Sequence, residues 1–96
     1  MIVREFTERF HDGGTTYRAR VACAPYRDRL WQGWIEFVRG DGTVLRTDRE
    51  TVQPSCDAVT YWAEGLEPLY LEGAFERAVR PGPGSERAAA RASAPG

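Results

Sequence analysis

The stretch RTDRETVQPS, residues 46–55, is the most polar in the first two thirds of the chain. Within it, Arg49 and Glu50 place a guanidinium donor beside a carboxylate acceptor, shortly after a tryptophan-rich segment. Such groups could bind a carboxylate, a peptide or a phosphate backbone through charge-assisted hydrogen bonds. The alternative is a connector that leads into a helix, with its charges solvated at a sheet edge where they discourage aggregation. Exposed ion pairs contribute little to stability or binding, so we favour the connector.

The three tryptophans suggest a second surface. Trp31 and Trp62 fall on apolar stripes, which predicts that both belong to the core. Trp34 falls on the opposite side of its strand with Gln32 and Glu36, where Arg18 and Arg20 of the preceding strand would join it. An arginine–tryptophan surface is suited to cation–π contacts or to a protein partner. The alternative is a tryptophan ring that is simply packed by arginine stems.

The chain has two cysteines and one histidine. Cys23 and Cys56 are too far apart in sequence to indicate a zinc site, and nothing in their spacing requires a disulfide. Cys56 is expected in the first turn of a helix, where a thiolate is stabilised. No histidine or CxxC motif accompanies it, so we expect a small packing residue. His11 lies next to a turn and is expected to be solvated.

Motifs that carry catalysis are missing from the sequence. We find no glycine-rich phosphate loop, no HExxH and no GxSxG, and GDGT lacks the later ligands of a calcium loop. We therefore predict no catalytic residues, no metal and no cofactor, and we do not expect an enzyme.

Charge is unevenly distributed along the 96 residues, although the net charge is only −1. Residues 1–49 carry nine arginines against seven acids, residues 50–76 carry six acids and no base, and residues 77–96 carry four arginines against one acid. A nucleic-acid-binding domain is usually basic, so nucleic acid is an unlikely partner. No apolar run is long enough to span a membrane, and the first residues lack a secretory pattern. Either the chain is intracellular or a leader has been removed, and we expect a cytoplasmic protein.

Alternation of apolar and polar residues predicts three or four antiparallel strands in a meander. Residues 2–10 alternate poorly, but an Asp-Gly turn follows and favours a strand. Residues 15–24 and 30–38 alternate cleanly, and a second Asp-Gly turn leads to a short strand at residues 43–47. Gly33 lies between two tryptophans, so a ring is expected to pack over it.

A C-terminal helix should cover one face of this sheet, which makes the fold class α+β. Ser55 is a suitable N-cap, and Asp57 lies in the first turn, where it complements the helix dipole. Gly65 and Pro68 then interrupt the pattern, and the helix bends or breaks there.

Before the interruption, an apolar stripe recurs at helical spacing: Val59, Trp62, Ala63 and Leu66. The stripe after it, Leu71, Phe75 and Val79, points more than a quarter-turn away. If the helix breaks, which we favour, Pro68 starts a second helix and re-aims the apolar face. If it only bends, this second stripe is surplus and forms a partner-binding surface.

We assign residues 1–80 to a single domain. Residues 81–96 are rich in proline, glycine and alanine and almost free of large apolar residues, so we expect a disordered tail.

The run WQGWIEF…RTDRETVQPS…YWAEGLEPLYLEGAFERA resembles a domain of unknown function that small bacterial proteins carry. The resemblance covers roughly residues 15–80 and implies no activity, ligand or site residue. The order of strands and helix is also similar to that of antitoxin and double-stranded-RNA-binding domains, but only in topology, and topology does not carry function.

These observations favour a small non-catalytic interaction or adaptor module, which binds a protein partner or forms a homodimer through the stripe Leu71, Phe75 and Val79. The alternative is a nucleic-acid-binding regulator that uses the sheet face with Arg18, Arg20, Trp34 and Arg49.

Overall fold

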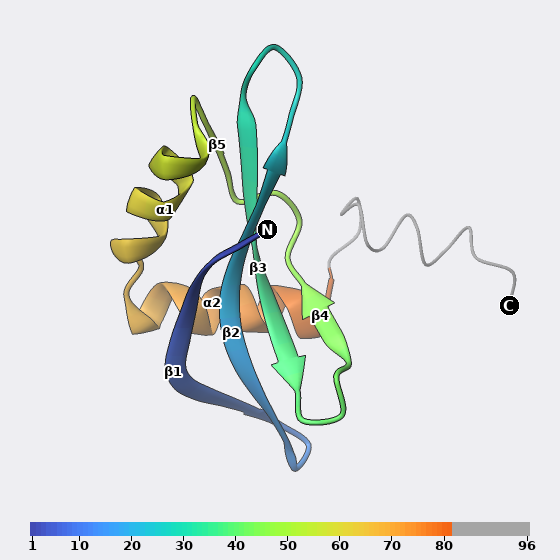
Figure 1. Cartoon of the computed structure of the whole chain (residues 1–96). Helices are drawn as coiled ribbons and strands as arrows, with labels where there is room; N and C mark the ends of the chain where they lie inside the picture. Colours follow the sequence, from blue (N-terminus) through green and yellow to red (C-terminus); the bar gives the residue numbers. More distant parts are fainter. Residues whose placement is uncertain (82–96) are drawn as a thin grey trace, which may run out of the picture.

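The computed structural model describes residues 1–81, and Figure 1 shows their arrangement. The elements are β1 (Ile2–Asp12), β2 (Thr15–Pro25), β3 (Trp31–Arg39), β4 (Val44–Arg46), β5 (Thr51–Gln53), α1 (Cys56–Glu64) and α2 (Pro68–Val79). All strand pairs are antiparallel, in the order β1–β2–β3–β4. The short β5 pairs with β3 along the same edge as β4. The predicted α+β class and meander are confirmed, whereas β5 was not predicted.

The first hairpin turn is present, one residue beyond the predicted Asp-Gly pair, because Asp12 is the last residue of β1 and pairs with Thr15. Gly13 and Gly14, the two residues between β1 and β2, have φ angles of +55° and +81°. A two-residue turn with both φ angles positive matches the twist of the flanking strands, and only glycine adopts it without strain.

Strand β1 is irregular, which explains its poor alternation. Glu5 pairs with Arg20 and Arg9 pairs with Arg18, so the three residues 6–8 lie opposite the single residue Ala19. Such a bulge bends a strand and increases its twist, and β1 curves strongly around the sheet in Figure 1.

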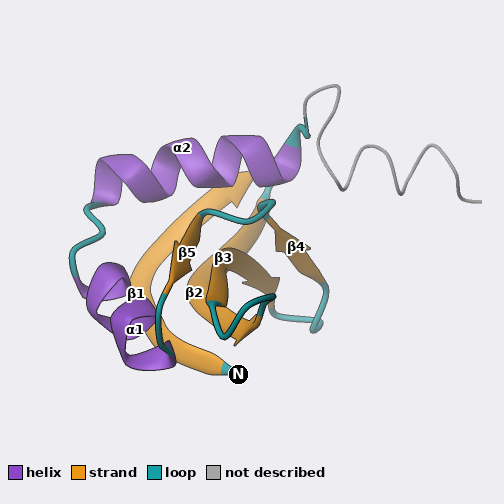
Figure 2. Ribbon diagram, turned by 90° about the horizontal axis from the view of Figure 1, so that it is seen from above, coloured by secondary structure: helices purple, strands orange, loops and turns teal. Residues whose placement is uncertain are grey.

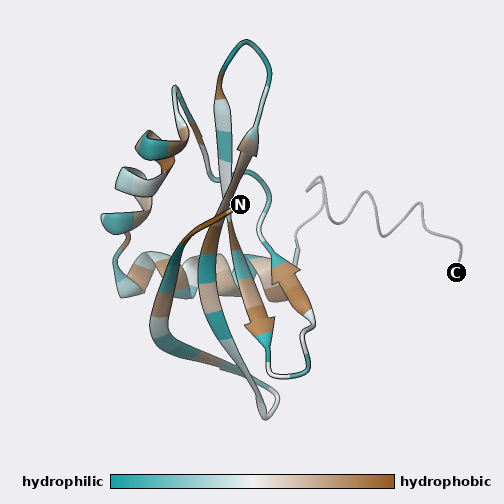
Figure 3. Ribbon diagram, viewed as in Figure 1, coloured by the Kyte–Doolittle hydropathy of each residue, from teal (hydrophilic) through white to brown (hydrophobic). Residues whose placement is uncertain are grey.

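Both helices lie on one face of the sheet, as Figure 2 shows, and leave the other face open. The alternation along β2 and β3, visible in Figure 3, sends one set of side chains into the core under the helices. This set includes the predicted inward residues Tyr17, Ala19, Val21, Cys23, Ile35 and Phe37, all buried. Phe75 of α2 closes the core, with ring centroids 5.0 Å from Phe37 and 5.4 Å from Phe10.

The helical region is two helices. Ser55 caps α1 as predicted, because its hydroxyl accepts a hydrogen bond from the Ala58 amide at 3.0 Å. Gly65 caps the C-terminus of α1, and Pro68 is at the start of α2. Proline suits this position because the first helical amides have no partner inside the helix.

The break corrects the prediction of a partner-binding stripe. Leu71 and Phe75 are 1% and 8% exposed, and Val79 is half-buried against the same core. The re-aimed face of α2 therefore belongs to the core of this chain and offers no surplus surface.

Side chains pack closely over Gly33, as predicted, but they are not aromatic rings. A Cβ atom on Gly33 would lie 2.8 Å from Val59 Cγ1 of α1 and 3.0 Å from Thr51 Cγ2 of β5. Aliphatic groups rather than an aromatic ring therefore occupy the space above this glycine.

Candidate functional site

The open face of the sheet brings Arg20 and Trp34 together, as predicted, and the carboxylate of Glu36, predicted on the same face, joins them. Glu36 lies opposite Arg20 in the β2–β3 register. Its carboxylate accepts hydrogen bonds from Arg20 Nε at 2.7 Å and from Trp34 Nε1 at 2.9 Å. Arg46 of β4 stacks on the Trp34 ring, with its guanidinium carbon 4.4 Å from the ring centroid. Trp34 is therefore already packed by charged neighbours.

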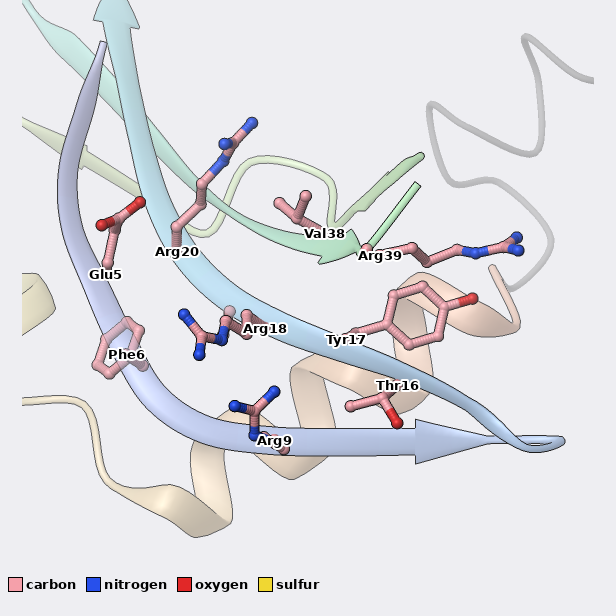
Figure 4. A pocket seen from close by; sticks show the side chains of 11 residues that line it. Glu5, Phe6, Arg9, Thr16, Tyr17, Arg18, Arg20, Val38 and Arg39 are labelled. Carbon is pink, nitrogen blue, oxygen red and sulfur yellow. The ribbon is translucent and has the colours of Figure 1, made fainter. Parts of the chain in front are cut away.

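Arg18 lies further along β2, in a hollow of about 330 Å³ on the same face. Figure 4 shows Arg9 of β1 and Arg18 of β2 projecting into this hollow between their strands, with Glu5 at its rim. The two arginines are direct cross-strand partners. Neither forms an ion pair within residues 1–81. Like charges directly opposite each other are destabilising, so this pair would be stabilised by an anion.

Arg49 and Glu50 do not form the joint site that was considered for them. Tyr26 belongs to the loop between β2 and β3. The guanidinium carbon of Arg49 lies over the Tyr26 ring, 4.7 Å from the centroid. Glu50 accepts hydrogen bonds from Tyr70 Oη and from Arg77 Nη2, the latter at 2.8 Å. The stretch 46–55 thus acts as a connector, and Glu50 anchors α2.

A groove that the sequence did not reveal lies at the corner between α1 and α2. It has a volume of about 670 Å³ and is lined by Gln53, Ala58, Tyr61, Trp62, Gly65, Leu66 and Tyr70. Tyr70 meets Trp62 edge-on at 6.3 Å. Burial raises the pKa of Tyr70 to about 12, and the hydrogen bond to Glu50 adds to this rise.

The rim of this corner combines exposed apolar groups with free acids. Tyr61 and Leu69 are 80% and 79% exposed. Asp57 and Glu64 are four residues before and three residues after Tyr61, so the three share one face of α1. Glu67 lines the adjoining pocket beside Leu69. None of these acids is in an ion pair within the described part of the chain.

The two cysteines meet in space, which corrects the expectation that Cys56 has no second thiol nearby. Cys23 Sγ and Cys56 Sγ are 2.9 Å apart, and both are free thiols. Cys23 is 1% exposed, whereas Cys56 is half-buried. Burial raises the pKa of the Cys23 thiol from its ordinary 9.0 to about 11, and the hydrogen bond with Cys56 adds to the rise. Sequence spacing gave no signal for this contact, because strand β2 and helix α1 come together only in the fold.

The described residues contain neither a group of metal-ligating side chains nor a helix of membrane-spanning length and hydropathy. Between residues 1 and 81 no three His, Cys, Asp or Glu side chains are grouped so that they could hold a metal ion. His11 instead shares a hydrogen bond with Thr16 at 3.1 Å across the first hairpin. None of the helices in this part of the chain has the length and apolar character needed to cross a membrane.

Comparison with known proteins assigns no family to the chain: no family model matches, nor does any curated protein or solved structure.

Proposed function

We propose that this protein is a non-catalytic interaction module that binds a basic, apolar segment of a partner protein at the α1–α2 corner. The observation that carries this proposal is the corner itself, where Tyr61 and Leu69 are almost fully exposed beside an apolar groove. Tyrosine and tryptophan are enriched among the residues that dominate protein interfaces. The proposal keeps the predicted class of function but moves the surface from the buried face of α2 to this corner.

Charge defines the chemistry of the partner. Asp57, Glu64 and Glu67 surround the apolar groups, and residues 50–76 contain no basic residue. Complementary charges steer association and suppress wrong partners. A segment with one or two large apolar side chains flanked by lysine or arginine fits both the groove and its rim. A bacterial origin and a cytoplasmic location belong to the same proposal and rest on the resemblance and the residue pattern.

Selection of displayed random peptides on the full chain tests this function. Enriched peptides should carry net positive charge and one or two aromatic or aliphatic residues. Their binding, measured by fluorescence anisotropy, should weaken at least tenfold in Tyr61→Ala and Leu69→Ala, which remove interface anchors. Val44→Ala is the matched control, since Val44 is an exposed apolar residue of β4, away from the corner. Failure to enrich basic peptides, or equal binding by the Tyr61→Ala variant, would refute the proposal.

A second candidate function, binding of a nucleic-acid backbone, rests on the unpaired Arg9 and Arg18. Phosphate contacts from arginine dominate affinity for nucleic acids and make it salt-dependent. Arg20, Trp34 and Arg49 contribute less than predicted, because each already contacts a neighbouring side chain.

Titration with a single-stranded oligonucleotide at several salt concentrations tests this alternative. Arg9→Gln and Arg18→Gln should each weaken binding and reduce the salt slope by about one. Arg27→Gln, at an exposed loop position, serves as the control. Absence of binding at low salt would eliminate the candidate.

A further inference from the structure

We propose that Cys23 and Cys56 form a modification site, at which a small-molecule disulfide converts the two thiols into an intramolecular disulfide between β2 and the first turn of α1. This site is separate from the α1–α2 groove, since neither cysteine lines it. Its test therefore succeeds or fails independently of the proposed function.

Distance is the first argument. The two sulfur atoms are 2.9 Å apart, and a covalent S–S bond is about 2.0 Å long. Closing the remaining gap of about 0.9 Å requires only a small adjustment of two side chains. The residues are 33 positions apart in sequence, so the fold has already brought together groups that an unfolded chain holds far apart.

Unequal access sets the order of the steps. Cys56 is half-buried, and its sulfur reaches the surface beside Met1 Sδ at 3.7 Å. Cys23 is 1% exposed and lies in the core row of β2. A reagent in solution can therefore reach Cys56 first. Cys23 is shielded from solvent by the core, and Cys56 Sγ is the reactive group within its reach. The raised pKa keeps Cys23 protonated near neutral pH until then.

The chemistry is two successive thiol–disulfide exchanges. The Cys56 thiolate attacks one sulfur of the small disulfide, forms a mixed disulfide and releases one small thiolate. Cys23 then loses its proton and attacks Cys56 Sγ, which breaks the mixed disulfide and releases the second small thiolate. In sum, two protein thiols are oxidised to one disulfide, and one small disulfide is reduced to two small thiols, which take up the two protons.

The consequence is a covalent connection between the sheet and α1, which the reduced protein lacks. Cross-linking two distant positions removes conformational freedom from the unfolded chain. The melting temperature of the oxidised protein should therefore exceed that of the reduced protein by roughly 10–20 °C.

Equilibration of the full chain with mixtures of reduced and oxidised glutathione tests the site. After acid quenching, alkylation and tryptic digestion, we expect the peptide 21–27 linked to the peptide 50–77 in monomeric protein. In concentrated urea the equilibrium constant for forming this disulfide should be roughly 100-fold smaller. The reason is thermodynamic linkage: a disulfide that stabilises the fold is itself favoured by the fold to the same extent. Persistence of both thiols, linkage only between chains, or equal linkage in urea would overturn the proposal.

Two variants check the order of the steps. Cys23→Ala should stop at one glutathione on Cys56, since no second thiol can displace it. Cys56→Ser should take up no glutathione while folded, because Cys23 is inaccessible. If glutathione attached equally well to both variants, with circular dichroism showing native structure, the assignment of Cys56 as the attacking thiol would be wrong. The wild-type peptide map decides the outcome if a variant fails to fold.

Discussion

The covered and the open face of the sheet are built from the same strands, yet they hold aromatic side chains in different ways. On the covered face Phe37 is fully buried, and its ring packs edge-on against Phe75 and Phe10. On the open face Trp34 is half-buried between Arg46 and the carboxylate of Glu36. One face is thus stabilised by exclusion of water, and the other by charged side chains that stay partly hydrated.

This difference separates stability from recognition. Burial of a large apolar side chain contributes several times more than an exposed ion pair. The covered face therefore determines whether the domain folds, whereas side chains on the open face and at the α1–α2 corner can be substituted at little cost to stability. Substitutions on the two faces can test this division.

The largest effect is expected at the aromatic core. Phe37→Ala should lower the free energy of unfolding by about 3–5 kcal/mol, because it removes ring contacts and leaves a cavity. Trp34→Ala on the open face should cost about 1 kcal/mol, although it removes a larger side chain. Urea denaturation of both variants gives the two values. Similar losses in the two variants would abolish the distinction between the faces.

The second-largest effect is expected for the pH dependence of stability, through the thiol of Cys23 on the covered face of β2. Folding raises the pKa of Cys23 from 9.0 to about 11, so the folded chain holds this proton more tightly than the unfolded chain. The contribution of this thiol to stability should be fully present below pH 9 and be lost as the pH rises from 9 to 11, by about 2–3 kcal/mol. Thermal melts under reducing conditions measure the fall.

Cys23→Ala is the control for this pH effect. This variant should lose stability only above about pH 10. There the unfolded chain begins to ionise Tyr70, whose pKa folding also raises, so this group destabilises the fold in the same direction. An unchanged profile in this variant would show that Cys23 is not the group responsible.

A methyl group added under α1 should cost about 1–3 kcal/mol. Gly33→Ala places a Cβ atom 2.8 Å from Val59 Cγ1, so the helix or the strand must shift. Gly40→Ala is the matched control, since a Cβ atom there meets nothing within 4 Å. Calorimetric melting temperatures compare the two, and equal values would mean that α1 adjusts freely over the sheet.

The smallest effect is expected for the ion pair on the open face. Arg20→Gln should lower stability by about 0.2–1 kcal/mol, because the Arg20–Glu36 pair is only partly shielded from water. The difference between variant and wild type should shrink in high salt. A loss above 2 kcal/mol that persists in high salt would mean that this face is a core in its own right.

Much of the fold could be predicted because short-range sequence patterns indicate its strands, turns and helix ends. The alternation along residues 15–24 and 30–38 fixes which side chains face inward, and glycine or proline marks the turns and the helix break. Irregular pieces were harder to predict. The bulge at residues 6–8 disrupts the alternation of β1, and β5 is too short for any period to appear.

The candidate sites depended far more on contacts between distant segments. Arg20 and Trp34 could be placed on one face from alternation, but Glu50 was assigned to the surface because its partners, Tyr70 and Arg77, follow 20 and 27 residues later. The stripe of Leu71 and Phe75 was predicted to bind a partner. The sequence does not show in which direction a second helix runs, and therefore which of its faces packs on the sheet.

The sequence by itself determined the α+β class, the inward rows of β2 and β3, the cap at Ser55 and an interruption of the helical pattern at Gly65 and Pro68, because each depends on neighbours within one turn or one strand. Only the tertiary structure decided that the interruption separates two helices, that the apolar stripe of α2 packs on the core, that Cys23 meets Cys56, and that Tyr61 and Leu69 remain exposed beside a groove. The physical reason is that burial depends on which elements pack together, and packing joins residues that no local period relates.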